Sequence, residues 1–136
     1  MFNVGIHEDR SHILAVASGR ANLAQLCGMA DIVATVANMN GHKRALFDLL
    51  AVEPQLSFSE HLQFGMHFAT SLARLERVAS VVSERERKGT SEKAAQKHGL
   101  TFRTFTDLDE AWNWLLPGMI ARKPAGEGAA AAPSPP

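Results

Sequence analysis

The sequence predicts a single α/β domain with a mixed, mostly parallel five-stranded sheet and four helices. Strand-like segments alternate with segments of helical periodicity, in the order β-β-α-β-α-β-α-β-α. Roughly 120 residues precede a terminal stretch rich in Pro, Ala and Gly, which is the length of one ordinary domain. With 46% hydrophobic residues, the chain has enough apolar side chains to form a core.

A hairpin and a helix are predicted first. Alternating apolar residues over 2–6 and the segment 12–17 predict two adjacent strands joined by a polar turn. Asn22, followed three residues later by a glutamine, predicts a capping box that begins a helix ending near Met39. This helix carries more apolar residues than one buried face requires.

The rest of the domain is predicted to alternate strands and helices. The expected elements are a strand at 44–50, a helix from a Ser57 cap to about Glu76, a strand at 78–82, a short helix capped by Ser91, a strand at 101–105 and a helix capped by Asp107. In an open α/β sheet, ligands bind beyond the carboxyl ends of the strands. The loops that follow the predicted strands, including Asp48, therefore form the rim on which a site is expected.

We expect the folded domain to span residues 1–116 and a disordered tail to span residues 117–136. The chain has 14 Lys and Arg against 14 Asp and Glu, so no global field attracts nucleic acid. Its first residues lack a basic region followed by an apolar core, and the most apolar helix is too polar to span a bilayer. These patterns predict a cytoplasmic protein without stable membrane insertion.

Three stretches resemble the STAS / SpoIIAA-like family, named for sulfate transporters and anti-sigma factor antagonists. They are the hairpin leading into SGRANLAQL, the segment LFDLLAVEPQLSFSEHLQFG, and the ending FRTFTDLDEAWNWL. The resemblance covers roughly residues 2 to 116, and the last stretch resembles the SpoIIAA-like branch in particular. Some members of that branch are compared with Sec14-type lipid-binding domains, which implies an apolar pocket.

The resemblance implies a bacterial regulatory switch. In the best-understood members a kinase phosphorylates a serine in an Asp-Ser-Ser-Gly motif, at the N-terminus of the helix after the third strand. Here Leu56 stands at the Asp position, the Gly is absent, and an ungapped match places Phe58 at the phosphorylated position. Ser57 and Ser59 flank it and are the candidate phosphoacceptors, although Ser57 is first of all a predicted helix cap.

An apolar interaction patch is also predicted on the first two long helices. Leu62 and Gly65 fall on the stripe expected to face the core of the second helix, with Phe58, Ala69 and Leu72. The patch residues lie off the predicted core stripes, and they are Met29, Ile32, Val36, Phe64 and Phe68. The alternative is that the two helices bury these side chains against each other. If they form a patch, the double substitution F64D/F68D abolishes partner binding and leaves the fold intact.

No enzyme chemistry is assembled in the sequence. Asp48 has two interpretations, a surface carboxylate that binds loop amides or a functional group on the rim, but no catalytic partner can be named for it. Cys27 lies on the apolar stripe of the first helix and is expected to be a buried, inert thiol. Metal-ligand spacings and glycine-rich phosphate-binding loops are absent, so neither a metal nor a cofactor is predicted.

The sequence therefore predicts a non-enzymatic STAS-like domain that acts in regulation through protein–protein interaction. The alternative function is a domain that binds a small apolar ligand or lipid, with a pocket between the helices and the sheet. A protein partner is expected, and a homodimer is a further interpretation of the apolar surface.

Overall fold

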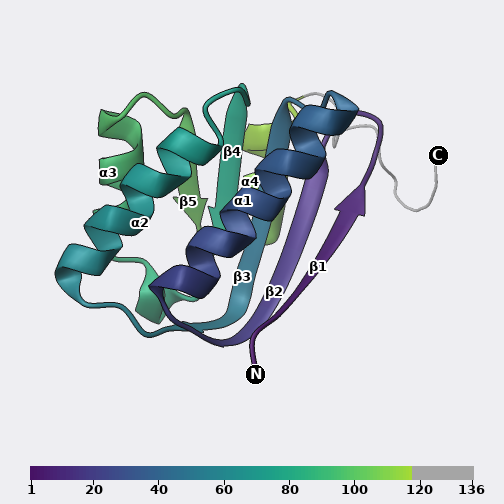
Figure 1. Ribbon diagram of the computed structural model, residues 1–136. Helices are drawn as coiled ribbons and strands as arrows, with labels where there is room; N and C mark the ends of the chain where they lie inside the picture. The colour runs from purple at the N-terminus through teal and green to yellow at the C-terminus, as the bar shows by residue number, and fades with distance from the viewer. Residues whose placement is uncertain (118–136) are drawn as a thin grey trace.

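The computed structural model describes residues 1–117, which form one sheet with helices on both faces (Figure 1). Its strands are β1 (Asn3–Glu8), β2 (Ile13–Ala21), β3 (Arg44–Pro54), β4 (Arg77–Val81) and β5 (Phe102–Phe105). Its helices are α1 (Leu23–Asn40), α2 (Phe58–Ser71), α3 (Thr90–Lys97) and α4 (Leu108–Leu115), with a 3-10 turn η1 (Glu84–Glu86). The predicted fold class and element order are confirmed. Except for Pro117, the predicted tail lies outside the described residues.

The strands lie in the sheet in their chain order, β1-β2-β3-β4-β5. β1 pairs antiparallel with β2, and all other pairs are parallel. Every crossover between parallel strands steps in the same direction, so right-handed connections place α1, α2 and α3 on one face. The chain reaches the other face only after β5, where α4 covers β3, β4 and β5.

The two longest strands extend further than the sequence predicts. β2 continues to Ala21 and β3 to Pro54, because the two strands stay paired beyond the last residue that β3 shares with β4. Their register shifts between Val16 and Ser18, where β3 contains a bulge. The segment predicted as a loop after Leu50 is therefore mostly strand, and the rim lies further along the chain.

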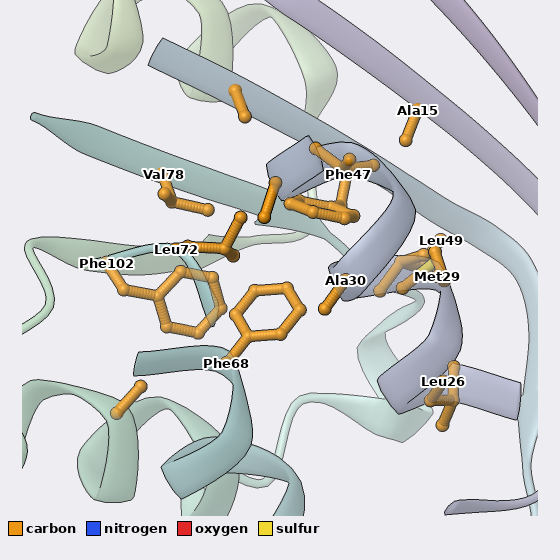
Figure 2. Close-up of a cluster of buried hydrophobic side chains, with 14 of the residues drawn as sticks. Ala15, Leu26, Met29, Ala30, Phe47, Leu49, Phe68, Leu72, Val78 and Phe102 are labelled. Carbon is orange, nitrogen blue, oxygen red and sulfur yellow. The ribbon is translucent and has the colours of Figure 1, made fainter. Parts of the chain in front are cut away.

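The main core lies between the sheet and helices α1 and α2. Phe68 is at its centre, with ring centroids 4.8 Å from Phe47, 4.9 Å from Phe64 and 5.1 Å from Phe102. Figure 2 shows Phe68 with Phe102 on one side and Phe47 and Ala30 on the other. Such tilted and edge-on ring pairs stabilise a core beyond the area they bury. These aromatic side chains fix how α2 is rotated against the sheet.

A second core lies under α4 and is smaller. Leu46, Val81 and Phe105 of the sheet pack there against Leu115 of the helix. Two arginines of the sheet bind the carboxyl end of α4, since Arg44 donates to the carbonyl of Leu115 (2.7 Å) and Arg77 to that of Trp114 (2.5 Å). These bonds satisfy carbonyl groups that a helix end leaves unpaired.

Most predicted helix starts are confirmed, whereas α2 ends at Ser71 and not near Glu76 as predicted. Asn22 and Gln25 form the predicted capping box of α1, and Asp107 accepts a hydrogen bond from the Glu110 N–H at the start of α4. The Ser91 cap is wrong, because α3 begins two residues earlier than predicted, after Gly89, whose φ of 80° is in the left-handed region. Among residues 1–117, no helix is both long and apolar enough to cross a membrane.

Gly65 determines how closely α2 and α3 approach each other. A Cβ atom at this position would lie 2.5 Å from the Ser91 carbonyl oxygen and 2.7 Å from the Ala94 Cβ. Only a residue without a side chain allows this contact between the two helices. The close packing fixes the start of α3 beside the first turns of α2.

Candidate functional site

The segment with the two candidate phosphoacceptors forms the N-terminus of α2. The Ser57 hydroxyl accepts a hydrogen bond from the Glu60 N–H (3.2 Å), and the Glu60 carboxylate accepts one from the Ser57 N–H (3.0 Å). The predicted capping box is therefore confirmed. Ser59 is exposed, has no role in the cap, and has its hydroxyl oxygen 3.3 Å from that of Ser57. Ser57 is also exposed, but its hydroxyl is engaged in the cap.

Asp48 is not at the end of its strand. It lies inside β3 at the bulge, where its carboxylate accepts a hydrogen bond from the Leu50 N–H (3.2 Å). Its neighbour Phe47 faces the main core, and because successive side chains in a strand alternate, Asp48 faces the α4 side of the sheet. The interpretation as a carboxylate that binds a nearby amide is confirmed, and its position on the rim is wrong.

The predicted apolar patch is largely core. Exposed fractions are 1% for Met29, 9% for Phe64 and 2% for Phe68, so these three side chains cannot contact a partner in this conformation. Ile32 is 52% exposed and Val36 is half-buried. The correction has a simple cause, since the phenylalanine pair of α2 faces the sheet, where Phe47 and Phe102 contact Phe68.

A different apolar stripe is exposed on α2, and the sequence interpretation assigned most of it to the core. Phe58, Leu62 and Met66 follow one another at a spacing of four residues, which places them on one side of the helix. Their exposed fractions are 71%, 38% and 46%. We call these three residues the α2 stripe. No local signal separates this stripe from the buried side, because Gly65, which packs against α3, lies only ~20° around the helix from Phe58.

A cavity of about 80 Å³ lies between α2, α3 and the sheet, beyond the carboxyl end of β4. Its inner wall is apolar and includes Phe64, Phe68 and Phe102, two of which appear in Figure 2. Its mouth is formed by Leu56 at the end of the β3–α2 loop and by the segment 86–92 that leads into α3. We call it the α2–α3 cavity; it lies where the alternative function requires a pocket.

Two hydroxyl groups lie at the wall of this cavity within the sheet. Ser80 and Thr104 are neighbours on β4 and β5, both buried, and their side-chain oxygens are 3.2 Å apart in a hydrogen bond. Two hydroxyls that share one bond leave one proton over, and no acceptor for it occurs among residues 1–117. A buried donor without an acceptor favours a ligand that supplies one.

His61 and Ser91 meet at the mouth, but they do not form a nucleophile and its base. The Ser91 hydroxyl donates to the backbone carbonyl of His61 (3.0 Å), and its oxygen lies 3.3 Å from His61 Nδ1. Because the only proton of the hydroxyl points to the carbonyl, the imidazole must donate rather than accept. Burial and the nearby Lys88 charge lower the pKa of His61, which keeps the ring neutral at pH 7.

At the mouth of the cavity, the acidic lining residues have hydrogen-bond or ion-pair partners, whereas the basic lining residues form no ion pair within residues 1–117. The Glu86 carboxylate pairs with Arg85 (3.8 Å), and Glu92 accepts a hydrogen bond from the Thr104 N–H (3.1 Å). By contrast, Arg87 and Lys88 are exposed and form no ion pair with the described residues. The segment that closes the cavity thus presents two cations, whereas both of its acids already have partners.

The remaining predicted features do not form a site. Cys27 is only partly buried, where a buried thiol was predicted, although burial does raise the pKa of its thiol. Within residues 1–117, no three side chains among His, Cys, Asp and Glu are grouped so that they could hold a metal ion. Among the sequence-predicted site residues, Ser57 and Ser59 lie beside the start of the α2 stripe, and Phe64 and Phe68 line the α2–α3 cavity with the newly found Ser80 and Thr104.

Comparison with known proteins shows a likeness of fold. No protein-family model matches the chain, and no curated protein is similar to it in sequence. A DUF3478-family protein with a SpoIIAA-like fold from Shewanella loihica PV-4 superposes with a TM-score of 0.52 and 18% identity, over 84% of this chain and 93% of that one. An anti-sigma factor antagonist from Mycobacterium paratuberculosis superposes with a TM-score of 0.59 and 12% identity, over 85% and 94%. The chain has a SpoIIAA-like fold.

The predicted resemblance is therefore confirmed for the architecture of the domain. In it the helix after the third strand is α2, so Ser57 and Ser59 stand where the resemblance places the phosphorylated segment. Their phosphorylation, the cytoplasmic location and the bacterial setting stay predictions.

Proposed function

We propose that this SpoIIAA-like domain is a non-enzymatic regulatory domain that binds a protein partner through the α2 stripe. The observation that carries the proposal is the exposure of Phe58, Leu62 and Met66 on a side of α2 that borders its core-facing side. Isolated exposed apolar residues are ordinary, but a stripe along a helix is typical of a docking surface. An anti-sigma factor antagonist among the proteins of similar fold is consistent with a partner that is itself a protein.

The chemistry beside the stripe suggests what the partner presents. Lys88 lies close enough to His61 for its charge to lower the pKa of that histidine, and His61 is the residue before Leu62 in the chain. Cations without ion pairs beside apolar side chains complement a segment that combines apolar and acidic residues. We therefore propose a partner helix or loop of that composition, in place of a second copy of this neutral chain.

Phosphorylation of Ser57 or Ser59 would act as a switch at the start of this surface. Phosphorylation of Ser59 adds about two negative charges beside Phe58, which would repel an acidic partner segment. The N-terminus of α2 tolerates such a charge, since the amide dipoles there favour anions. Ser57 is the less suitable acceptor because its hydroxyl holds the cap. Both remain candidate phosphoacceptors.

The stripe is tested by charge substitutions that leave the core untouched. Phe58→Asp and Met66→Asp together are expected to abolish capture of the partner from the cells that make the protein. Met39→Asp is the matched control, because Met39 is 77% exposed at the far end of α1. The measurement is quantitative mass spectrometry of affinity-purified complexes. A partner that binds the stripe variant and the control equally well would contradict the proposal.

A second function is favoured by the α2–α3 cavity. We infer that the domain also binds a small, mainly apolar molecule, as the alternative from the sequence expects. The supporting observation is an apolar cavity that opens beside the α2 stripe and contains one hydroxyl proton without an acceptor. Natural pockets for small molecules have this character, with an apolar lining and a few placed polar groups.

A further inference from the structure

We propose that the ligand of the α2–α3 cavity is a short-chain oxo acid, a molecule with an alkyl chain, one carbonyl oxygen and one carboxylate. This inference rests on the second function above and specifies its ligand. Three features of the cavity carry it: its volume, its spare hydroxyl proton and the cations at its mouth.

The volume limits the buried part of the ligand to a few atoms. The cavity measures about 80 Å³. An apolar cavity of ~150 Å³ binds benzene, so this cavity holds roughly half as many atoms, the equivalent of a short acyl group. The phenylalanines 64, 68 and 102 offer such a group an apolar wall. A long acyl chain or a nucleotide base is too large for this space.

The hydroxyl pair requires an acceptor on the buried part. One proton of Ser80 and Thr104 has no acceptor among the described residues, and both side chains are buried. A purely alkyl ligand would leave that donor desolvated and unpaired, whereas a carbonyl oxygen would satisfy it. A carboxylate at this depth is disfavoured, because the Glu92 side chain that binds the Thr104 N–H is already an anion there.

The side chains at the mouth of the cavity determine which charged group of the ligand can bind there. Lys88 and Arg87 line the opening and form no ion pair with residues 1–117, while Glu86 and Glu92 are engaged elsewhere. The two cations can pair with a carboxylate at the opening, while Glu86 and Glu92 leave the lining neutral as a whole, which suits a singly charged carboxylate better than a phosphate dianion. The carboxylate then stays partly in water, where it keeps its hydration.

The proposal is tested by calorimetric titration of the full-length protein with three probes of similar size. Levulinate has the oxo group and the carboxylate, valerate lacks the oxo group, and methyl propyl ketone lacks the carboxylate. We expect levulinate to bind about three- to tenfold more tightly than either of the others, as one hydrogen bond or one exposed charge contact allows. Equal affinity for all three probes would overturn the proposed ligand while leaving a binding cavity.

Single substitutions in the cavity test which side chain contacts the oxo group and which contacts the carboxylate. Thr104→Val is expected to reduce levulinate affinity to that of valerate, and Lys88→Gln to weaken both acids but leave the ketone unchanged. Lys97→Gln is the matched control, because this exposed lysine does not line the cavity. A Lys88→Gln variant that binds the acids normally would overturn the position of the carboxylate.

A variant with a blocked mouth tests whether the probes bind inside the cavity. Leu56→Trp is expected to remove binding of all probes while the melting temperature stays within a few degrees, since Leu56 is only partly buried. Absence of binding in the unmodified protein would overturn both the ligand and the second function. Displacement of levulinate by inorganic phosphate would identify a phosphate site and overturn the carboxylate assignment.

Discussion

Phe58 and Phe68 lie on the same helix, but only Phe68 contacts the core. Its ring touches three other phenylalanines and is 2% exposed, whereas Phe58 is 71% exposed. The two residues are identical in chemistry, so composition cannot distinguish their roles. Their environments determine them, through aromatic contacts from β3 and β5 that the sequence of α2 does not contain.

Phe68→Ala is expected to lower the free energy of unfolding by about 3–5 kcal/mol, because it removes a ring from the centre of the core and leaves a cavity. Phe58→Ala is the control and is expected to change it by less than about 0.5 kcal/mol. Urea denaturation followed by circular dichroism measures both. The double substitution F64D/F68D should therefore unfold the domain, which corrects the expectation that its fold survives. Equal losses of unfolding free energy in the two alanine variants would show that Phe68 does not face the core as described.

At the scale of elements, the N-terminus of α2 combines a structural cap with a candidate switch. The reciprocal bonds of Ser57 and Glu60 hold the first turn, and Ser59 stands exposed within it. Because Ser57 is already engaged, a modification of Ser59 can change the surface without opening the helix. The position of the helix start was predictable from four consecutive residues, since capping boxes depend only on local spacing.

Ser57→Ala is expected to destabilise the domain by about 1 kcal/mol through loss of the cap. Ser57→Asp should restore nearly all of this, because a carboxylate caps equally well and also interacts favourably with the helix dipole. Ser59→Ala is the control and should be close to neutral. Thermal and urea unfolding measure the three variants. If Ser59→Ala were the more damaging substitution, Ser59 and not Ser57 would be the cap.

On the scale of the whole molecule, several titrating groups act in the same direction. Burial lowers the pKa of His12, which packs against the Trp112 ring at 5.0 Å, and also that of His61. Hydrogen bonds from His42 and Asn40 lower the pKa of Glu8, and those from Ser71 and His67 lower the pKa of Asp31. In each case the unfolded chain takes up the proton first as the pH falls.

Stability is therefore expected to decrease on acidification in two steps. The first begins as the pH falls below about 6.5, where the histidines titrate in the unfolded chain, and the second below about 4.3, where the carboxylates do. Urea midpoints measured from about pH 7.5 down to about pH 4 test this. The double variant His12→Asn and His61→Gln should flatten the first step and leave the second. A domain that becomes more stable between pH 7 and 5 would contradict the assignment.

The sequence by itself determined the fold class, the order of elements and most helix starts. These depend on local signals: periodicity, the capping residues Asn22, Ser57 and Asp107, and a glycine after α1. A likeness of fold to SpoIIAA-like proteins follows from the same order of elements.

Only the tertiary structure decided what faces outward and where a site can form. The rotation of α2 against the sheet depends on the contacts of Phe68 with Phe47 and Phe102. The length of β3 depends on its pairing with β2. The polar wall of the α2–α3 cavity depends on hydroxyl groups from two different strands. None of these partners lies near the other in the chain, so no local pattern reports them. Burial and hydrogen bonding between distant segments are properties of the packed molecule, because each side chain contributes only half of a contact.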